Sequence, residues 1–483
     1  MADRNAVQTS RERQPQGQAL EDKALLLQTL GLGALKPAAG IDKAQPAFRG
    51  HAQAPPPAHS AQVLQIPPRK ARVVAAAVPK SFMFLQGVSS PFFAQLSRGL
   101  RNEGHWVKSI NFNMGDVLYG HGTRKFYSSR PEQLEDFYAQ FIRDHGITDL
   151  VLFGDQRPVH KPAVHVAKLQ GVRVHVFEEG YFRPYWVTLE RDGVNNNSRL
   201  PRDPEWYREV GKYIPRYKNG NAFKLSFASR AFHDVMYHVG GAFNRVCFPH
   251  YRTHAPFNAA VEYAGYLRHG LRLMQARARD AEVVSQVATE RQQTFLLPLQ
   301  LDSDAQIRDH SRFDNMSDVL HEVLGSFAAH ASGDARMVVK NHPLTPGIVD
   351  YHRITRQIAA QYALADRVDF LETGHMPTLL SHVAGVVTIN STVGGSSMLH
   401  HRPTHALSDP IYALPGLTHQ GPLDQFWQNA EPPDDQLFQR FRNTVIHTTQ
   451  VNGGFYTRCG INMAVTNAVE VLLAKKSKIE QYL

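Results

Sequence analysis

The sequence predicts an α/β fold with two Rossmann-like halves, a helical segment between them and a disordered N-terminal tail. Short apolar runs alternate with amphipathic segments along residues 79–203, and the same alternation returns along residues 291–450. Between these two series, the pattern is helical and rich in polar and aromatic side chains. Alternation of strands and helices favours a doubly wound, parallel sheet in each half.

The first 78 residues lack the apolar content of a folded domain. They are rich in Ala, Gln and Pro, and only residues 20–35 have helical periodicity. Because such a segment buries too little apolar area to offset its ordering entropy, we predict a disordered tail. Residues 1–80 hold eleven Lys/Arg and five Asp/Glu, so about six of the ten net positive charges lie there. The piece at 20–35 is either a nascent helix or a docking element.

The first half opens with an apolar strand at 82–86, and Pro91 begins the helix that follows. The later elements expected in this half are a strand at 105–110, a helix at 131–145, a strand at 148–153, a helix at 159–170 and a strand at 172–177. These repeated strand–helix–strand units predict parallel strands.

Residues 204–290 are interpreted as a helical insertion or bridge, and residues 451–483 as a C-terminal helix. The second half is expected to have strands at 292–300, 335–343, 368–372, 385–390 and 404–408, and helices at 315–331, 348–363, 376–383 and 392–402. Ligands of such sheets bind beyond the carboxyl ends of the strands, so polar residues there are the candidate site residues.

Composition argues against several classes of protein. No apolar run approaches the 18 residues of a membrane-spanning helix, and the N-terminal stretch has no apolar core of a secretory signal. Two cysteines cannot make a disulfide framework, which favours a reducing compartment. The sequence has no stripe of Lys and Arg interleaved with aromatic residues, and this argues against nucleic-acid binding. We therefore expect a cytoplasmic protein, free or resting on the cytosolic face of a membrane.

Two adjacent carboxylates follow the apolar strand 172–177. Glu178 and Glu179 precede Gly180, which permits a sharp turn, and Arg183 comes close behind. Neighbouring side chains of an extended segment point to opposite sides. We predict that one carboxylate packs against Arg183 or another cation, while the other faces a cleft as a nucleophile or general base.

Three aspartates give weaker signals. Asp155 follows strand 148–153 and is either a partner in a loop ion pair or a substrate ligand. Asp302 and Asp304 imitate the DxD metal motif of some glycosyltransferases, although a three-residue pattern often arises by chance. We favour Gln300 and Asp304 as hydrogen-bonding ligands for a sugar or a base.

A rigid turn follows the strand at 335–343. Lys340 and His342 lie beside Pro343 in the stretch VVKNHPLTPG. A cation and an imidazole in such a turn suit phosphate binding and protonation of a leaving group.

A second anion site is predicted at Asn390, Ser391 and Thr392, between a strand and a helix start. Backbone N–H groups, two hydroxyls and the helix dipole favour an anion there, although a hydroxyl would cap the helix in any case. Because no Walker A or GxGxxG motif is present, ATPase and NAD-dependent functions lose their main support. A His, a Lys and a helix start can neutralise a monophosphate without a metal, which favours a CMP donor over a UDP or GDP donor.

The stretches FEEGYFRPYWVTLERDGVNNNS, PLQLDSDAQI, KNHPL and TINSTVGGSSMLHHRPTHALSDPIYALPGLTHQGPLDQFW resemble the bacterial capsule polysaccharide biosynthesis and export family of the KpsS/LipB type. The resemblance runs from about residue 80 to about residue 445. It implies a GT-B-like arrangement and a retaining β-Kdo transferase, which moves Kdo from CMP-Kdo to phosphatidylglycerol or lysophosphatidylglycerol. That transfer starts the linker of a capsular polysaccharide. No metal or other cofactor is expected.

The resemblance also assigns residues. Glu179 matches an aspartate in the EDG motif of KpsC-type enzymes, as nucleophile or charge stabiliser, and is one methylene longer. The other matched positions are Gln300 and Asp304 (QxxxD), His342 and Pro343 (HP), and Ser391 and Thr392 (the hydroxyl pair). Implied partners are the membrane surface, a second Kdo transferase and a capsule export transporter. The alternatives are a non-catalytic export factor and a metal-dependent transferase that uses a nucleoside diphosphate sugar.

Overall fold

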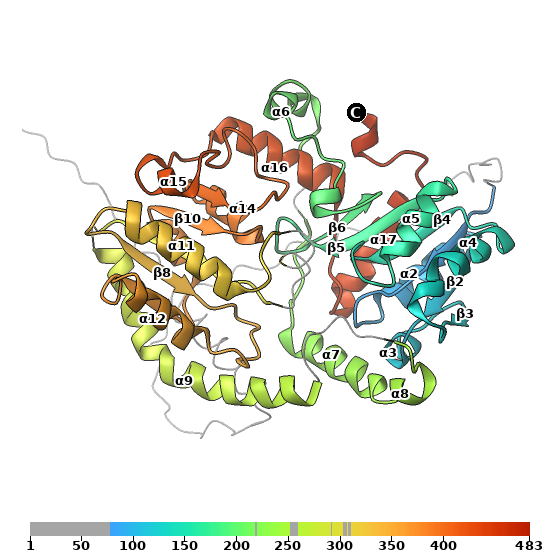
Figure 1. The fold of residues 1–483 in the computed structure, drawn as a ribbon. Helices are drawn as coiled ribbons and strands as arrows, with labels where there is room; N and C mark the ends of the chain where they lie inside the picture. The colour runs from blue at the N-terminus through green and yellow to red at the C-terminus, as the bar shows by residue number, and fades with distance from the viewer. Residues whose placement is uncertain (1–77, 218–219, 252–258, 291, 303–306, 308–310) are drawn as a thin grey trace, which may run out of the picture. The chain divides into compact units, whose positions relative to one another are not determined.

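Two β-sheets organise the residues that the structure, a computed structural model, describes (Figure 1). These residues are 78–217, 220–251, 259–290, 292–302, 307 and 311–483. Nearly all of the predicted tail lies outside them. Both sheets belong to one unit, Lys80–Leu483.

The first sheet has the strand order β12-β6-β5-β4-β1-β2-β3. Its strands are β1 (Ser81–Phe84), β2 (Trp106–Asn111), β3 (Thr123–Phe126), β4 (Asp149–Phe153), β5 (Arg173–Glu179), β6 (Trp186–Arg191) and β12 (Gln450–Asn452). Its helices include α2 (Phe92–Asn102), α3 (Met114–Leu118), α4 (Leu134–Asp144) and α5 (Lys161–Leu169). Strands β1 to β5 pair in parallel. Of these, β1, β2, β4 and β5 were predicted, whereas β3 and the antiparallel edge formed by β6 and β12 were not.

The end of the chain returns to this first sheet. Helix α16 (Asp435–Thr449) leads into β12, which pairs with β6, and α17 (Arg458–Leu473) follows. Leu472 of α17 shares a buried cluster with Leu96 and Leu100 of α2. The last residues therefore complete the core of the first sheet.

The second sheet has five described strands in the order β11-β10-β7-β8-β9, and all its pairs are parallel. Its strands are β7 (Thr294–Pro298), β8 (Arg336–Lys340), β9 (Val368–Leu371), β10 (Gly385–Thr388) and β11 (Thr404–Ala406). Its helices include α11 (Met316–His330), α12 (Tyr351–Gln361), α13 (Met376–His382), α14 (Thr392–Leu399) and α15 (Leu423–Asn429). The predicted α/β fold class with two largely parallel sheets is confirmed.

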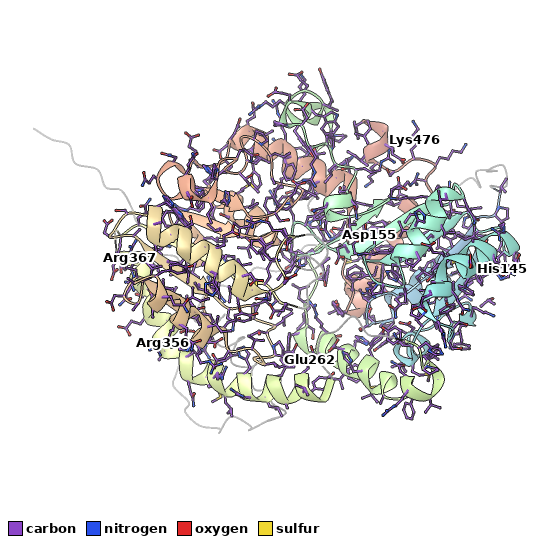
Figure 2. The ribbon with its side chains drawn as sticks, viewed as in Figure 1. His145, Asp155, Glu262, Arg356, Arg367 and Lys476 are labelled. Atoms are coloured by element: carbon purple, nitrogen blue, oxygen red, sulfur yellow. The ribbon has the colours of Figure 1, made fainter. Side chains whose placement is uncertain are left out.

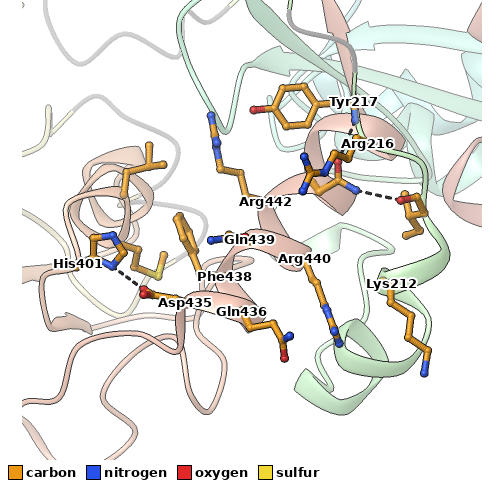
Figure 3. A pocket seen from close by; sticks show the side chains of 15 residues that line it. Lys212, Arg216, Tyr217, His401, Asp435, Gln436, Phe438, Gln439, Arg440 and Arg442 are labelled. Atoms are coloured by element: carbon orange, nitrogen blue, oxygen red, sulfur yellow. Dashed lines mark hydrogen bonds and ion pairs between the residues drawn. The ribbon is translucent and has the colours of Figure 1, made fainter.

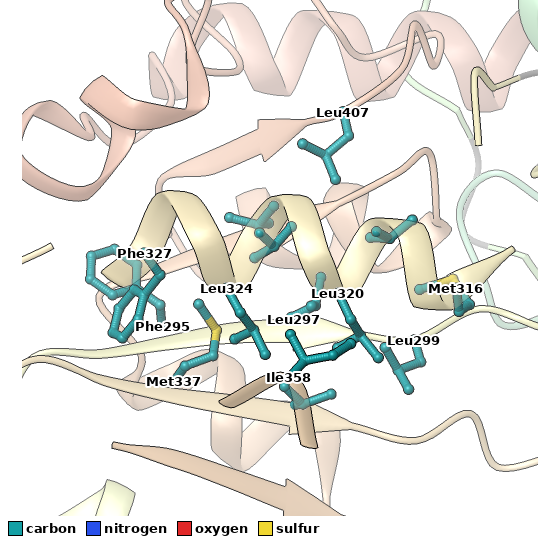
Figure 4. Packing of buried hydrophobic residues seen from close by; sticks show 14 of the residues in the cluster. Phe295, Leu297, Leu299, Met316, Leu320, Leu324, Phe327, Met337, Ile358 and Leu407 are labelled. Atoms are coloured by element: carbon teal, nitrogen blue, oxygen red, sulfur yellow. The ribbon is translucent and has the colours of Figure 1, made fainter. Parts of the chain in front are cut away.

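Alternation along β7 builds a core on each face of the second sheet. Leu297 packs with Leu320 and Leu324 of α11 (Figure 4), whereas the preceding Leu296 packs with Leu379 of α13. All of these side chains are fully buried. Successive strand residues point to opposite faces, so a continuous apolar run serves both layers.

The segment between the sheets is mostly helical, in agreement with its sequence pattern. It contains α6 (Pro204–Glu209), α7 (Phe227–Gly241), α8 (Asn244–Cys247) and α9 (Ala259–Thr289). Tyr237 of α7 donates to Asp116 of α3, 2.9 Å away, which ties α7 to the first half. Asp280 of α9 accepts bonds from the backbone of Glu372 and Thr373, which ties α9 to the second half. Among the described helices, none is both long and apolar enough to cross a membrane.

Candidate active site

The two adjacent glutamates lie inside β5, not after it. Strand β6 pairs with β5 through Glu178 and Glu179, so the strand continues two residues past its predicted end. Gly180 follows at a close approach of two chains, because a Cβ atom there would lie 2.3 Å from the carbonyl oxygen of Trp186. This contact, and not a sharp turn with positive φ, explains the glycine.

Glu179 lies near two arginines. Its carboxylate is 4.0 Å from Nη2 of Arg183 and 3.8 Å from Nη1 of Arg230 on α7. The side chain of Glu179 keeps 28% of its surface exposed. Glu178 accepts a bond from the backbone N–H of Glu179 at 3.0 Å. Cations therefore lie beside one of the two carboxylates, and that carboxylate is Glu179, the one that the resemblance assigns as reactive.

Arg230 was not predicted, and its position depends on a third segment. Its guanidinium carbon lies 5.0 Å from the ring centre of Tyr456. Ser229 beside it donates to the carbonyl of Tyr456 at 2.7 Å. A cation over an aromatic face is stabilised electrostatically, so this contact helps to orient Arg230 toward Glu179. Because Arg230 is separated from both partners by long stretches of chain, no local pattern indicates it.

The turn after β8 fixes the ring of His342. The backbone N–H of His342 donates to Oδ1 of Asn341 at 2.9 Å, and Asn341 also donates to Glu372. The backbone N–H of Leu344 donates to Nδ1 of His342 at 3.1 Å. Since Nδ1 is an acceptor, the neutral ring carries its proton on Nε2 and can donate from there.

Three cations act on His342. Burial, together with the charges of Lys340, Arg183 and Arg230, lowers the pKa of His342 from 6.5 to about 4. The imidazole is therefore neutral at pH 7. Because Arg183 and Arg230 also flank Glu179, the carboxylate from the first half and the imidazole from the second half belong to one electrostatic environment.

Lys340 lies beneath the turn and not on its surface. Its side chain is 5% exposed, and burial lowers its pKa despite the nearby carboxylates of Asp280 and Glu372. Lys340 therefore adds positive charge to the site from below. Pro343 is exposed in the same turn.

Two predicted residues of the second half form a buried pair. Gln300 follows β7 and Asn390 follows β10, which is the neighbouring strand. The side-chain amide of Gln300 donates to Oδ1 of Asn390 at 3.0 Å, and the backbone N–H of Asn390 donates back at 3.4 Å. Strand ends that meet at one edge thus bring together residues that are 90 positions apart.

The helix start of α14 has the predicted cap. Ser391 is the N-cap residue, and its hydroxyl accepts a bond from the N–H of Val393 at 3.2 Å. Thr392 is the first residue of the helix. Both are partly exposed, so their hydroxyls can reach a ligand.

The predicted aspartates have different surroundings. Asp155 follows β4 (Figure 2), is 3% exposed and accepts a bond from Asn197 at 2.8 Å. Asp302 accepts bonds from the backbone of Met316 and from Tyr351, so it anchors the start of α11. Asp304 lies outside the described residues. Among the described residues, no group of three or more His, Cys, Asp or Glu side chains is placed to hold a metal ion.

A buried carboxyl group lies near Asp155. Glu190 on β6 accepts bonds from Tyr181 and Ser198. Burial raises the pKa of Glu190 from 4.5 to about 7, and the charge of Asp155 adds to the increase. The sequence analysis predicts no element at Glu190, so its burial on a strand was not foreseen.

A cavity of about 740 Å³ is separate from these residues (Figure 3). Its charged lining is formed by Lys212, Arg216, His401, Asp435, Arg440 and Arg442. His401 pairs with Asp435 at 2.5 Å. None of the predicted site residues lines this cavity.

The fold and the site define a two-sheet α/β protein whose strand ends carry a carboxylate, arginines and an imidazole. Residues 148–456 match the family model described as "Capsule polysaccharide biosynthesis protein". Because the match covers more than half of the chain, the protein belongs to this family.

Curated relatives agree with this assignment. The capsule polysaccharide export protein KpsS of Escherichia coli is 35% identical over 78% of this chain and 97% of its own length. The capsule polysaccharide modification protein LipB of Neisseria meningitidis is 34% identical over 78% of this chain and 92% of its own length. Among solved structures, a β-Kdo 2,7 transferase, KpsC of Thermosulfurimonas dismutans, is 14% identical, with a TM-score of 0.37, over 81% of this chain and 99% of that one.

Proposed function

We propose that this protein is a retaining glycosyltransferase that transfers Kdo from CMP-Kdo to a phosphatidylglycerol-type lipid and so starts the linker of a capsular polysaccharide. The observation that carries the proposal is the arginine pair shared by Glu179 and His342. A carboxylate that faces developing positive charge, beside cations that face a leaving phosphate, is what transfer from a sugar phosphate requires.

In this mechanism the phosphate of CMP-Kdo binds among Arg183, Arg230 and His342. The neutral His342 ring donates its Nε2 proton in a hydrogen bond to a phosphate oxygen, while the arginines offset the charge that develops as CMP departs. Lys340 and the helix start at Ser391 add positive potential. These groups supply the charge that a divalent metal would otherwise provide, so the proposed reaction needs no metal or other cofactor.

Two roles for Glu179 fit the reaction. As a nucleophile, its carboxylate bonds to the anomeric carbon while the bond from that carbon to the phosphate oxygen breaks. The acceptor hydroxyl then attacks the same carbon from the face opposite Glu179, passes its proton to a phosphate oxygen of the departing CMP and releases Glu179, so two inversions give retention. As a stabiliser, Glu179 offsets the positive charge of the sugar without forming a bond.

The proposal is tested with the purified full-length protein, CMP-Kdo and a fluorescent lysophosphatidylglycerol. We expect an acceptor whose mass has risen by one Kdo unit, together with released CMP. Activity should be unchanged by EDTA, whereas a metal-dependent transferase would lose it and recover it with Mn²⁺. Intact CMP-Kdo with no modified acceptor would reject the proposal.

The second candidate is a non-catalytic export factor, which is favoured by the name of the Escherichia coli relative, a capsule polysaccharide export protein. The two functions differ in their response to Glu179→Gln and His342→Ala in capsulated cells. A transferase loses surface capsule in both variants, whereas an export factor retains it. In either case we propose that the protein works at the cytosolic face of the inner membrane, with a second Kdo transferase and the capsule transporter as partners.

A further inference from the structure

Helix α7 has one packed face and one bare face. On the packed face, His233 contacts Tyr119, and Gly240 allows α7 to approach the backbone of Met114. The opposite face carries exposed apolar side chains at a helical spacing that continues through α8: Phe232, Val235, Val239, Phe243 and Val246. Intervals of three and four residues place these side chains on one stripe.

Helix α9 repeats this arrangement. Its inner face pairs Arg272 with Asp350 at 3.0 Å and buries Asp280 beside the second sheet. Its outer face exposes the apolar residues Leu267, Leu271 and Met274, at intervals of four and three residues. We call these residues, together with the stripe on α7 and α8, the bridge surface.

The helices that carry the two parts of the bridge surface adjoin. His238 of α7 and Tyr263 of α9 have ring centres 6.2 Å apart. Figure 1 shows α8, α7 and α9 following one another along the lower edge of the view. An exposed apolar area that spans three helices differs from the scattered apolar residues of an ordinary protein surface and marks a site of interaction.

Charge around the bridge surface indicates the kind of partner. Residues 224–277 contain seven Lys/Arg and two Asp/Glu. Among these cations, Lys224, Arg245, Arg268 and Arg277 are exposed. Apolar side chains bordered by Lys and Arg are typical of helices that lie in a membrane interface, where the cations meet anionic headgroups.

We propose that the bridge surface docks this protein on an anionic lipid bilayer, with the apolar stripes of α7, α8 and α9 inserted among the headgroups. The choice of a bilayer over a protein rests partly on the proposed function, in which the acceptor is a lipid. Helix α7 links the two features directly, because Arg230 contacts the candidate site while Phe232 and Val235 face outward.

The test is flotation of the full-length protein with vesicles. One set contains phosphatidylcholine alone, and the other also contains phosphatidylserine, which is anionic but is not the proposed acceptor. We expect flotation with the anionic set and much less with the neutral set. The affinity of the double variant Phe243→Ser/Leu271→Ser for anionic vesicles should be lower by roughly tenfold or more, since interfacial binding scales with inserted apolar area.

The matched control is Trp106→Ser/Leu169→Ser, whose side chains are equally exposed but lie outside the bridge surface. It should float like the unmodified protein, and circular dichroism should show that both variants fold. Equal flotation of both variants would assign lipid binding to another part of the chain and overturn the inference. Failure to float, together with a dimer that Phe243→Ser/Leu271→Ser dissociates, would make the surface a protein interface and also overturn it.

Failure of this inference differs from failure of the proposed function. Flotation needs no CMP-Kdo, so vesicle binding by a protein without transferase activity supports docking and removes only the proposed reaction. Conversely, a protein that transfers Kdo to a short-chain, water-soluble acceptor but does not float with vesicles supports the proposed reaction and rejects docking.

Discussion

The carboxylate of Glu179, at the end of β5, lies 3.8 Å from the guanidinium of Arg230 on α7. This separation is longer than a hydrogen bond, so the two groups attract each other without being locked together. Arg230 also helps to lower the pKa of His342. A residue of the helical bridge therefore acts on the candidate catalytic groups of both halves, which makes Arg230 the most informative position to change.

Arg230→Gln should weaken CMP binding. Losing one charged contact to phosphate is expected to reduce affinity roughly tenfold or more. Isothermal titration calorimetry with CMP measures this directly. Arg268→Gln is the matched control, because Arg268 is an exposed arginine of α9 that has no described contact with Glu179. Equal affinities for the two variants would contradict a phosphate site at Arg230.

Glu179→Gln should abolish turnover while leaving CMP binding nearly intact, since the substitution keeps the size of the side chain and removes its charge. We expect the rate of product formation to fall at least on the order of a hundredfold, as for the loss of other catalytic carboxylates. Glu179→Asp, which restores the charge one methylene shorter, should recover part of the rate. A mass shift of one Kdo unit on the unmodified protein, absent from Glu179→Gln, would identify Glu179 as the nucleophile.

The imidazole of His342 should titrate near pH 4 in the free protein, because burial and three cations disfavour its charged form. Binding of CMP should raise this pKa, since the phosphate offsets the cations. NMR of ¹³C-labelled histidine, assigned by comparison with His342→Gln, measures both values. An ordinary titration near 6.5 in the free protein would contradict the burial of the ring among cations.

The same shift affects stability. The folded-state pKa of His342 is depressed, so the stability contributed by its neutral ring is present above pH 6.5 and is lost as pH falls toward 4. His342→Gln should therefore lose less stability than the unmodified protein over this range. Thermal melts at several pH values compare the two proteins, and parallel curves would count against the prediction.

Glu190 should give the opposite pH dependence. Its folded-state pKa is raised from 4.5 to about 7, so its contribution is present below pH 4.5 and is lost as pH rises to about 7. The expected loss is on the order of 3 kcal/mol, at about 1.4 kcal/mol per pKa unit. Glu190→Gln should remove most of this slope in chemical denaturation between pH 4.5 and 7.5. An unchanged slope would show that other groups cause it.

Four of the strands that the sequence predicted share a simple property. β4, β5, β7 and β8 are apolar and pair in parallel inside a sheet, so their composition alone indicates them. Three strands were missed: β3 is an exposed strand at one edge of the first sheet, and β6 and β12 form the antiparallel edge on the other side. β12 has only three residues, and a segment so short has no periodicity to detect. The edges of the first sheet are therefore the part of this fold that local sequence patterns indicate least.

The residues of the candidate site likewise fall into those that the sequence predicted and those that it could not. The rule that ligands gather at the ends of parallel strands correctly brought Gln300 close to Asn390. It could not tell which side chains point outward, and Lys340 proved to be buried. It also could not find Arg230, because the approach of α7 to β5 depends on packing between distant segments. Local patterns located the edge of each sheet, while the charges around Glu179 required the folded chain.

The pairing of β12 with β6 has a consequence for biosynthesis. Leu472 covers part of the α2 face, so the first sheet cannot finish folding until the ribosome has made nearly the whole chain. During translation, the apolar face of α2 therefore stays exposed while the second half folds, because α17 has not yet been made to cover it. A premature stop after residue 449 would consequently damage the earliest part of the protein, and such products should be rapidly degraded.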